Sequence, residues 1–574
     1  MLGFIAPYRG QFALALLLTL VLAVLNPLRP FLINYAIDNE VVKGNLSGLR
    51  FWIAVLVGMI MFQTVLMYFQ TWYTAWLGQR VMDDLRQQVF NHITRMRIQF
   101  FDRTPIGALQ TRTISDIETL NDVFSTGLVT LTGEMLQLIA IGAFMFYTDW
   151  RLTLVVLIVL PFIVLATQVF RVKVKGAFER VRKYVSELNT FTQEHVTGLL
   201  TTQIFTREQE EIRRFGEINR KHRQAHLDTI LYYSVFFPVV EILSALAIAL
   251  LIWDGAGGLI SGRVSPGDLI AFLIYIQLFF RPIRMIADQF NTLQLGLVSS
   301  ERVLNLLDNQ SIIAETQEAE TPTISGPPSV RFQNVWFAYQ NEDWVLRDIS
   351  FQVPSGTKTA LVGATGSGKS SILNLLVRFY EFPKGEIYVN EHDLRQFRQE
   401  DLRKVMGLAL QDVYLFSGSI YDNATLNNPD ISREAVAEAA REIGADGFIA
   451  QLPGGLDYQV GERGSLLSAG QRQLVGFIRT LVYNPSILLL DEATANVDTE
   501  TEQLIQAAID RLLAGRTALI VAHRLSTIQQ ADQILVMQQG QIIERGTHAQ
   551  LLTAQGHYHR LYELQYHLQT TTPG

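Results

Sequence analysis

Apolar positions in the first half of the chain gather into six long segments, whereas the second half alternates short apolar runs with helical patterns. A helix crosses a bilayer with about 20 mostly apolar residues, and each segment approaches or exceeds that length. The segments span residues 12–37, 51–77, 124–147, 152–170, 230–253 and 269–291. The pattern therefore predicts six transmembrane helices followed by an α/β region.

Proline and charged residues interrupt some of these segments. The fourth contains Pro161 as its only break, the first contains Pro27 and Pro30, and the sixth becomes amphipathic at Arg281 and Arg284. Any one segment alone could be a buried helix of a soluble protein. Six in succession predict a membrane domain.

Basic residues predict how this domain is oriented. The stretch between the second and third segments carries six arginines, and the stretch between the fourth and fifth carries twelve Lys and Arg residues. The alternate connections hold only Lys43, Arg50, Arg151 and Arg263. The positive-inside rule then places both long stretches, the N-terminus and the second half in the cytoplasm. We expect a multi-pass protein of the cytoplasmic membrane, with helices that continue well beyond the bilayer.

Charge and polarity divide the chain into parts. Residues 1–308 carry 27 Lys and Arg against 24 Asp and Glu, whereas the rest carries 20 against 30. Residues 311–329 are rich in Glu, Thr, Pro and Ser, as a linker would be. We expect an all-α six-helix transmembrane domain over 1–308, a linker over 309–328 and an α/β domain over 329–574.

Composition excludes several other classes of protein. The chain has no cysteine, which excludes disulfide scaffolds, thiolate metal sites and cysteine nucleophiles. No long run of basic residues indicates a nucleic-acid partner. Only 18% of the 574 residues are charged, below the figure of about 25% in soluble domains.

A phosphate-loop motif follows the apolar run 359–362 and precedes a helical stretch. Backbone N–H groups of such a loop, and the N-terminus of the helix after it, bind phosphate oxygens. Lys369 would supply charge to the β- and γ-phosphates, and the Ser370 hydroxyl suits Mg²⁺. The sequence therefore predicts binding of ATP and Mg²⁺ by residues Gly363, Ala364, Thr365, Gly366, Ser367, Gly368, Lys369, Ser370 and Ser371.

Two carboxylates end the apolar run 486–490. A buried strand that ends in two acids, downstream of a phosphate loop, is a Walker B arrangement. Asp491 would help to hold Mg²⁺ through water, and Glu492 would polarise the attacking water as the general base. The two motifs together predict an ATPase.

The residues Leu467, Ser468, Ala469, Gly470 and Gln471 resemble the signature motif of ABC (ATP-binding cassette) proteins. Further motifs resemble that family in order and spacing. Tyr339 resembles the adenine-stacking aromatic, Gln411 the glutamine that touches Mg²⁺, Asp498 the D-loop acid and His523 the catalytic switch histidine, while 460–463 resembles the X-loop of exporters.

The resemblance implies an exporter half-transporter, because membrane and ATPase parts are fused in this order. In the family two cassettes pair head to tail, so the signature residues would contact the ATP of a second half-transporter, identical or different. Segments 100–102 and 198–208 are similar to the family's coupling regions. Two departures concern the signature, where Ala469 replaces the usual Gly, and the D-loop, where Asn496 and Val497 replace the commoner Ala-Leu pair.

Function beyond ATP-driven transport stays open at this point. The leading prediction is export of small amphipathic substrates, drugs or lipids, across the bilayer. The alternatives are a dedicated exporter of lipid precursors or peptides, and a membrane ATPase that senses without transporting. Glu241 is a candidate cavity-facing acid, because ionisable residues at membrane depth face a cavity or each other. It could equally hold the helix bundle together.

Overall fold

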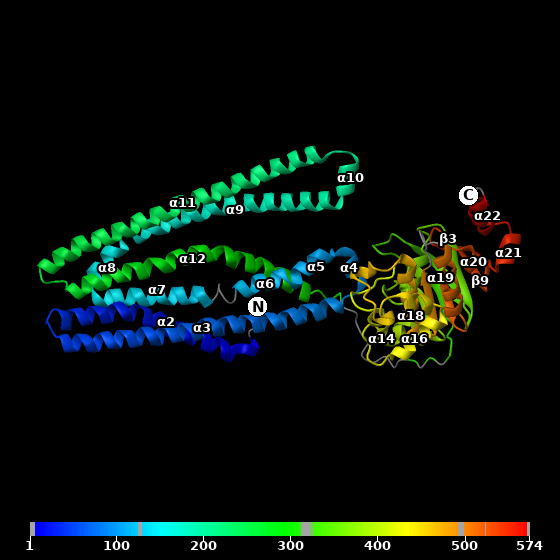
Figure 1. Ribbon diagram of the computed structural model, residues 1–574, viewed down its shortest axis with the longest axis horizontal. Coiled ribbons are helices and arrows are strands. Elements are labelled where there is room, and N and C mark those ends of the chain that lie inside the picture. The colour runs from blue at the N-terminus through cyan, green and yellow to red at the C-terminus, as the bar shows by residue number, and fades with distance from the viewer. Residues whose placement is uncertain are drawn as a thin grey trace. The chain divides into compact units, whose positions relative to one another are not determined.

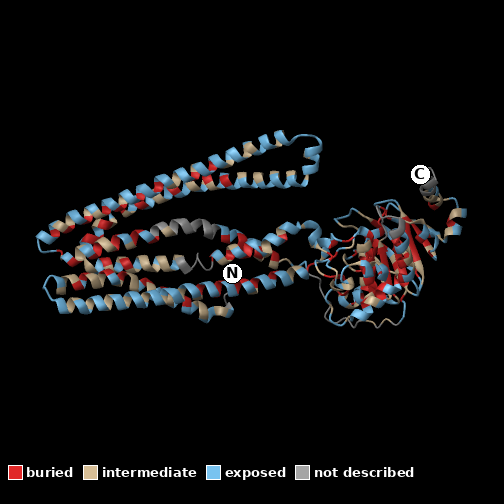
Figure 2. Ribbon diagram, in the orientation of Figure 1, coloured by how far each residue is buried: buried red, intermediate tan, exposed pale blue. Residues whose placement is uncertain are grey.

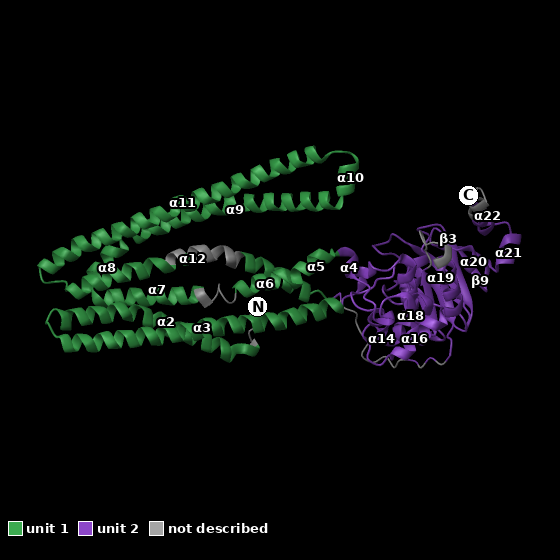
Figure 3. Ribbon diagram, viewed as in Figure 1, with its two compact units in different colours: residues 1–95, 104–310 green, residues 96–103, 311–574 purple. Residues whose placement is uncertain are grey.

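The computed structural model describes residues 6–123, 129–311, 322, 324, 326–491, 499–522 and 524–570 (Figure 1). Side chains are not described at 6, 129–130, 283–284, 286–294, 499–501 and 565–570. The chain forms two compact units (Figure 3). Unit 1 comprises Met1–Arg95 and Thr104–Gln310, and unit 2 comprises Met96–Arg103 and Ser311–Gly574. A short segment of the first half therefore belongs to the unit that the second half builds.

Unit 1 is helical throughout its described residues. Its elements are η1 (Ala6–Tyr8), α2 (Arg9–Ala36), the π-helix η2 (Ile37–Val41), α3 (Leu46–Thr94), α5 (Ile106–Thr113), α6 (Ser115–Asp122), α7 (Val129–Thr148), α8 (Trp150–Leu157), α9 (Leu160–Thr197), α10 (Leu199–Ile204), α11 (Glu208–Ile260) and α12 (Pro266–Leu307). The six expected segments lie in helices over their described residues, apart from a break in the fourth, and residues 124–128 of the third lie outside the described residues.

Five helical spans of the described residues are long and apolar enough to cross a membrane, by length and composition. They run over Arg9–Val41, Leu46–Thr94, Leu131–Thr148, Trp150–Thr197 and Glu208–Ile260. The sixth expected segment lies in α12, part of whose side chains is not described. Large apolar residues on these helices are exposed, such as Leu17 and Phe62, and Figure 2 shows exposed positions along the helices of unit 1. Such surface is stable in hydrocarbon.

The helices extend beyond a bilayer, as the helical pattern of the long stretches predicts. α3 has 49 residues and α11 has 53. At about 1.5 Å per residue, each is more than 70 Å long, whereas the hydrocarbon core is about 30 Å thick. The prediction that the helices continue beyond the bilayer is confirmed by their length, and the side of the membrane on which they continue stays a prediction.

The fourth segment differs from its expected form, because it is two helices and not one. α8 ends at Leu157, and α9 begins at Leu160 with Pro161 near its first position. Proline has no N–H to donate to the carbonyl of residue 157 and its ring crowds that carbonyl. Asp149 caps α8 by accepting hydrogen bonds from the backbone N–H groups of Arg151 and Leu152, at 2.7 and 3.1 Å.

Unit 2 contains two sheets. The antiparallel sheet has the order β2-β1-β4-β5, and the larger sheet has the order β10-β9-β3-β8-β7-β6, parallel except for β10. The strands are β1 (Val330–Phe337), β2 (Leu346–Val353), β3 (Lys358–Gly363), β4 (Lys384–Val389), β5 (His392–Asp393), β6 (Met406–Ala409), β7 (Ile487–Asp491), β8 (Thr517–Val521), β9 (Gln533–Gln538) and β10 (Gln541–Gly546). The strands expected at the apolar runs 359–362 and 486–490 are confirmed as β3 and β7.

Helices cover these sheets and complete two buried cores. They are α4 (Ile98–Arg103), α13 (Lys369–Leu376), η4 (Leu394–Gln396), α14 (Gln399–Val405), α15 (Ile420–Thr425), α16 (Arg433–Glu442), α17 (Asp446–Gln451), η5 (Gly455–Asp457), η6 (Glu462–Gly464), α18 (Ala469–Val482), α19 (Thr499–Leu512), α20 (Leu525–Gln529), α21 (His548–Thr553) and α22 (His557–Thr570). One core lies between the two sheets and α13, and the other packs α16, α18 and α19 on the larger sheet. Helix and sheet in these layers make unit 2 an α/β domain.

Candidate functional site

Parallel pairing brings four loops to one edge of the larger sheet. Leu361 of β3 pairs with Val521 of β8, and Val521 pairs with Asp491 of β7. Leu490 of β7 pairs in turn with Ala409 of β6. Since parallel strands end at the same edge, the segments that follow these four strands lie next to one another. This edge is where ligands bind in open α/β sheets.

The loop after β3 forms a cradle with its glycines in left-handed conformations. Gly366 has φ +81° and Gly368 has φ +100°, which residues with a Cβ rarely adopt. A Cβ added to Gly368 would lie 2.6 Å from the Leu346 side chain and 3.2 Å from the Val345 carbonyl oxygen. The predicted phosphate loop therefore has the backbone shape that requires its glycines.

Lys369 stands inside this cradle at the first position of α13. Its Nζ donates hydrogen bonds to the carbonyl oxygens of Gly363 and Ala364, at 2.8 and 2.9 Å. Burial lowers the pKa of the Lys369 ammonium group, and the nearby Asp491 carboxylate opposes that shift. Its hydrogen-bond acceptors are uncharged oxygens, those two carbonyls and the Ser367 hydroxyl, so the cation gains electrostatic energy from an anion in the cradle.

Ser370 and Asp491 meet across the strand ends. The Ser370 hydroxyl donates a hydrogen bond of 2.8 Å to Oδ2 of Asp491. Gln411 is exposed and lies two residues beyond the end of β6, the neighbour of β7. Hydroxyl, carboxylate and amide oxygens are the ligands that Mg²⁺ takes, with water completing its shell. The residues present fit a magnesium ion bridged to a phosphate.

Tyr339 lies on the other side of α13 within an aromatic cluster. Its hydroxyl is 3.0 Å from Oγ of Ser371, and either group can be the donor. Its ring is edge-on to those of Phe337 and Tyr380, with centroids 4.8 and 5.0 Å away. The predicted adenine-stacking residue and Ser371 are thus brought together, and the stacking role stays a prediction.

The signature residues begin α18. Ser468 is the N-cap: its Oγ accepts from the Gln471 N–H at 3.2 Å, and Oε1 of Gln471 accepts from the Ser468 N–H at 2.9 Å. Leu467 and Gly470 are buried, whereas Ser468 and Ala469 are exposed. Among the described residues no hydrogen bond or ion pair joins 467–471 to the phosphate loop. The N-terminus of α18, where the positive end of the helix dipole lies, is therefore exposed on unit 2.

Several predicted site residues lie outside the described residues. They are Glu492, Asp498 and His523. β7 ends at Asp491, β8 ends at Val521 and α19 begins at Thr499. The roles of the three residues therefore rest on their sequence motifs.

Sequence reasoning missed Tyr380 as a partner of the coupling segment. The Tyr380 hydroxyl donates a hydrogen bond of 2.6 Å to Oδ2 of Asp102, which belongs to α4 in unit 2. The backbone N–H of Arg97 also donates to the carbonyl oxygen of Ser311, at 2.9 Å. Burial first, and then the Asp102 carboxylate, raise the pKa of Tyr380, so it remains a donor. The one signal in the sequence was that Tyr380 is a tyrosine, whose hydroxyl needs a hydrogen-bond partner when the ring is buried.

Glu241, the acid proposed for the substrate path, lies on α11 with an exposed side chain. It does not line the groove between α9 and α11 that is described below, although Val239 and Leu243 do. Residues two apart on a helix point to nearly opposite sides. Its role in a cavity stays a prediction.

Family models match both halves of the chain. Residues 12–283 match the model of the ABC transporter transmembrane region, and residues 346–495 match the ABC transporter model. The helical unit, the phosphate cradle and the capped signature helix define the same class. The chain belongs to the ABC transporters, and it is a multi-pass membrane protein with an ATPase domain.

Individual relatives match over nearly the whole chain. A probable multidrug resistance ABC transporter ATP-binding/permease protein, YheH of Bacillus subtilis (strain 168), is 38% identical over 91% of this chain and 77% of its own length. An ATP-dependent lipid A-core flippase of Syntrophus aciditrophicus (strain SB) is 33% identical over 98% of this chain and 93% of its own length. The solved structure of a bacterial Atm1-family ABC exporter with ATP bound is similar, with a TM-score of 0.80, 27% identity, and coverage of 98% and 99% of the two chains.

Proposed function

We propose that this chain is one half of an ATP-driven exporter of amphipathic lipids or drugs in the cytoplasmic membrane. The observation that carries the proposal is the phosphate cradle, in which Lys369 and the Ser370–Asp491 pair meet at one sheet edge. The multidrug and lipid A-core relatives support the substrate class. The positive-inside rule supports a cytoplasmic N-terminus and ATPase domain.

We propose the following division of labour at the ATP site. Lys369 binds the β- and γ-phosphates, the N–H groups of the loop hold their oxygens, and Tyr339 stacks on the adenine. Ser370, Gln411 and Asp491, the last through water, hold Mg²⁺, which neutralises developing charge on the phosphates. Glu492 orients and deprotonates the attacking water, and His523 stabilises charge in the transition state.

A second copy or a homologous half-transporter completes each site in this proposal. The exposed Ser468 and the N-terminus of α18 face outward from their own unit, and no described hydrogen bond or ion pair joins them to their own phosphate loop. A γ-phosphate bound by a second cassette fits there, because the N-terminus of a helix favours anions. Asp498 in the D-loop would contact the same interface.

ATP would then drive the membrane spans between two access states. ATP draws two cassettes together, and hydrolysis releases them. Shifting a two-state equilibrium from 1:99 to 99:1 takes about 5.5 kcal/mol of differential binding. Two phosphates enclosed between cassettes can supply that energy, since charge-assisted hydrogen bonds contribute about 1.5–3 kcal/mol each.

The first test measures catalysis. Glu492→Gln should lower ATP turnover by at least about a hundredfold while ATP still binds, because general-base catalysis contributes about 10²–10⁴-fold. The protein is purified alone in nanodiscs, and nucleotide binding and phosphate release are measured together. Turnover that survives this change would refute the assigned general base.

A second test asks whether the sites are composite. Lys369→Ala and Ser468→Arg each inactivate a paired chain, but a mixture of the two variants should recover activity. In a mixed pair, one site receives both intact residues. The matched control carries both changes in one chain and is mixed with wild type, so that every site of the mixed pair is defective. Equal activity of the two mixed pairs would overturn head-to-tail sharing, and an inactive wild-type monomer would show that the partner is another chain.

A further inference from the structure

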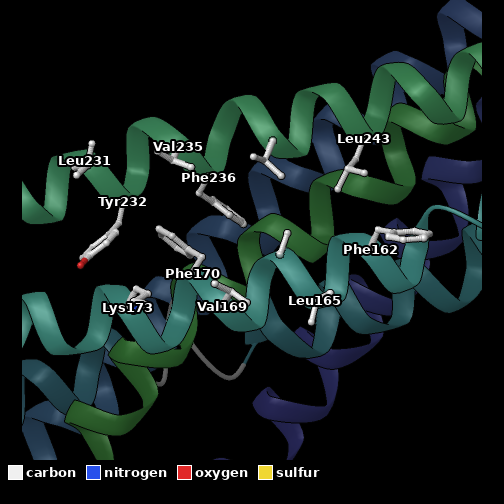
Figure 4. A pocket seen from close by; sticks show the side chains of 12 residues that line it. Phe162, Leu165, Val169, Phe170, Lys173, Leu231, Tyr232, Val235, Phe236 and Leu243 are labelled. Atoms are coloured by element: carbon white, nitrogen blue, oxygen red, sulfur yellow. The ribbon is translucent and has the colours of Figure 1, made fainter.

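A groove of about 660 Å³ opens between α9 and α11 in unit 1 (Figure 4). This volume lies within the range of about 300–1,000 Å³ for small-molecule sites. Apart from Lys173 and Tyr232, its lining is apolar. Both helices belong to membrane spans, so the groove is a candidate site for a molecule from the bilayer.

The two polar residues lie together at one end of the groove. Figure 4 shows Lys173 of α9 and Tyr232 of α11 at one end, and Phe162 and Leu243 at the other. Between them the rings of Phe170 and Phe236 stack at a centroid distance of 4.1 Å and join the two helices. Both rings are buried. The groove is therefore amphipathic along its length, with a cationic end and an apolar wall.

The length of the groove matches one leaflet. Eleven residues separate Phe162 from Lys173, which is about 16 Å of helix at about 1.5 Å per residue. Half of the hydrocarbon core measures about 15 Å. Lys173 lies just beyond the fourth apolar segment on its cytoplasmic side, in the orientation of the proposed function. Its ammonium group would stand at the level of the lipid headgroups.

Within the part of the chain that the structure describes, no carboxylate pairs with Lys173. The nearby acids pair with other cations: Glu179 lies 4.0 Å from Lys175, and Asp228 lies 2.9 Å from Arg180. A lone cation at the end of an apolar groove favours an anionic headgroup with a hydrocarbon tail.

We propose that this groove binds one anionic membrane amphiphile from the cytoplasmic leaflet, with its headgroup at Lys173 and Tyr232 and its acyl chain along the apolar wall. The proposal rests on the proposed function for the side of the membrane on which Lys173 lies. It assigns a ligand class to a site that is separate from the ATP site.

The probe is dioleoylphosphatidylglycerol, titrated against the full chain in detergent and counted by native mass spectrometry, with dioleoylphosphatidylcholine for comparison. Lys173→Gln should weaken binding of the anionic lipid about fivefold, the effect of one basic residue near a lipid surface. Binding of the zwitterionic lipid should not change. The matched control is Lys175→Gln, which removes a cation that pairs with Glu179 outside the groove and should leave both affinities unchanged.

A second pair of variants tests the apolar wall. Ala166 lines the groove, so Ala166→Trp should fill it and abolish binding of both lipids. Val172 lies on α9 outside the lining, with 62% of its side chain exposed, and Val172→Trp is the control. Wild-type affinity in Lys173→Gln or in Ala166→Trp would overturn the proposal. If Ala166→Trp separates paired chains and leaves lipid binding unchanged, the groove is instead where a second copy of the chain binds.

ATP turnover of every variant separates the two ideas. If the wild-type protein hydrolyses ATP but binds the anionic and the zwitterionic lipid equally well, only the proposal for the groove is refuted. A wild-type protein that hydrolyses no ATP alone or paired would refute the proposed function and leave the lipid measurement to stand by itself.

Discussion

Removing the Tyr380 hydroxyl should weaken communication between α4 and the rest of unit 2. Tyr380→Phe keeps the ring, and so keeps the edge-on contact with Tyr339 at 5.0 Å, but loses the hydrogen bond of 2.6 Å to Asp102. α4 is the segment of the first half that folds with unit 2. The change therefore isolates one polar contact and leaves the aromatic packing in place.

The expected size follows from the geometry of the bond. A short O–H donor to a carboxylate is charge-assisted, and such bonds contribute about 1.5–3 kcal/mol. Asp102 is exposed, so the lower end, about 1.5 kcal/mol, applies. If the bond forms in only one of two access states, its loss changes their ratio by about tenfold.

The assay is stimulation of ATP turnover by lipid or drug in nanodiscs, read as a double-mutant cycle. Tyr380→Phe and Asp102→Asn should each reduce stimulation by up to about tenfold, with basal turnover nearly unchanged. The double variant should lose no more than either single variant, because the two side chains make one shared contact. Tyr388→Phe is the control, since its hydroxyl makes a bond of the same length, 2.6 Å, to Glu386 within the ATPase unit. Additive losses, or an equal loss in the control, would refute the reasoning.

Three further predictions concern the phosphate cradle and the helices. Because burial lowers the pKa of Lys369, the side chain loses its charge as the pH rises through that lowered pKa. ATP affinity, measured by nucleotide titration, should therefore fall at alkaline pH in the wild-type protein. It should not change with pH in Lys369→Arg, because arginine stays charged. Gly368→Ala should weaken ATP binding at least about tenfold, because its φ is +100° and Leu346 occupies the Cβ position; unchanged binding would contradict the cradle. Asp116 is buried and accepts a bond of 2.8 Å from Ser299, so Asp116→Asn should cost about 1–3 kcal/mol and lower the melting temperature; an unaltered melting curve would count against this.

The pattern of apolar residues was sufficient to predict the helices that cross the membrane. The apolar runs that form α2, α3 and α11 are long enough as helices to cross a bilayer. In hydrocarbon a single segment can satisfy its own backbone hydrogen bonds only as a helix. The fourth segment shows where this reasoning ends. Pro161 was visible in the sequence, but a proline inside a span can either kink a helix or divide it. The structure shows a division, because α8 ends at Leu157, whose carbonyl Pro161 cannot reach with an N–H group, and α9 begins at Leu160.

The chemistry of the ATP site was legible because phosphate binding needs particular residues at short spacing. Glycines, Lys369 and Ser370 lie within one loop, so their local order already implies their geometry. The sequence alone thus determined the class of protein, the presence of its ATPase domain and the helical character of its apolar segments. Tyr380 contacts Asp102, and Lys173 and Tyr232 line one groove, although the members of each pair lie far apart along the chain. Only the tertiary structure could decide these contacts, because no local pattern records which distant side chains a fold brings together.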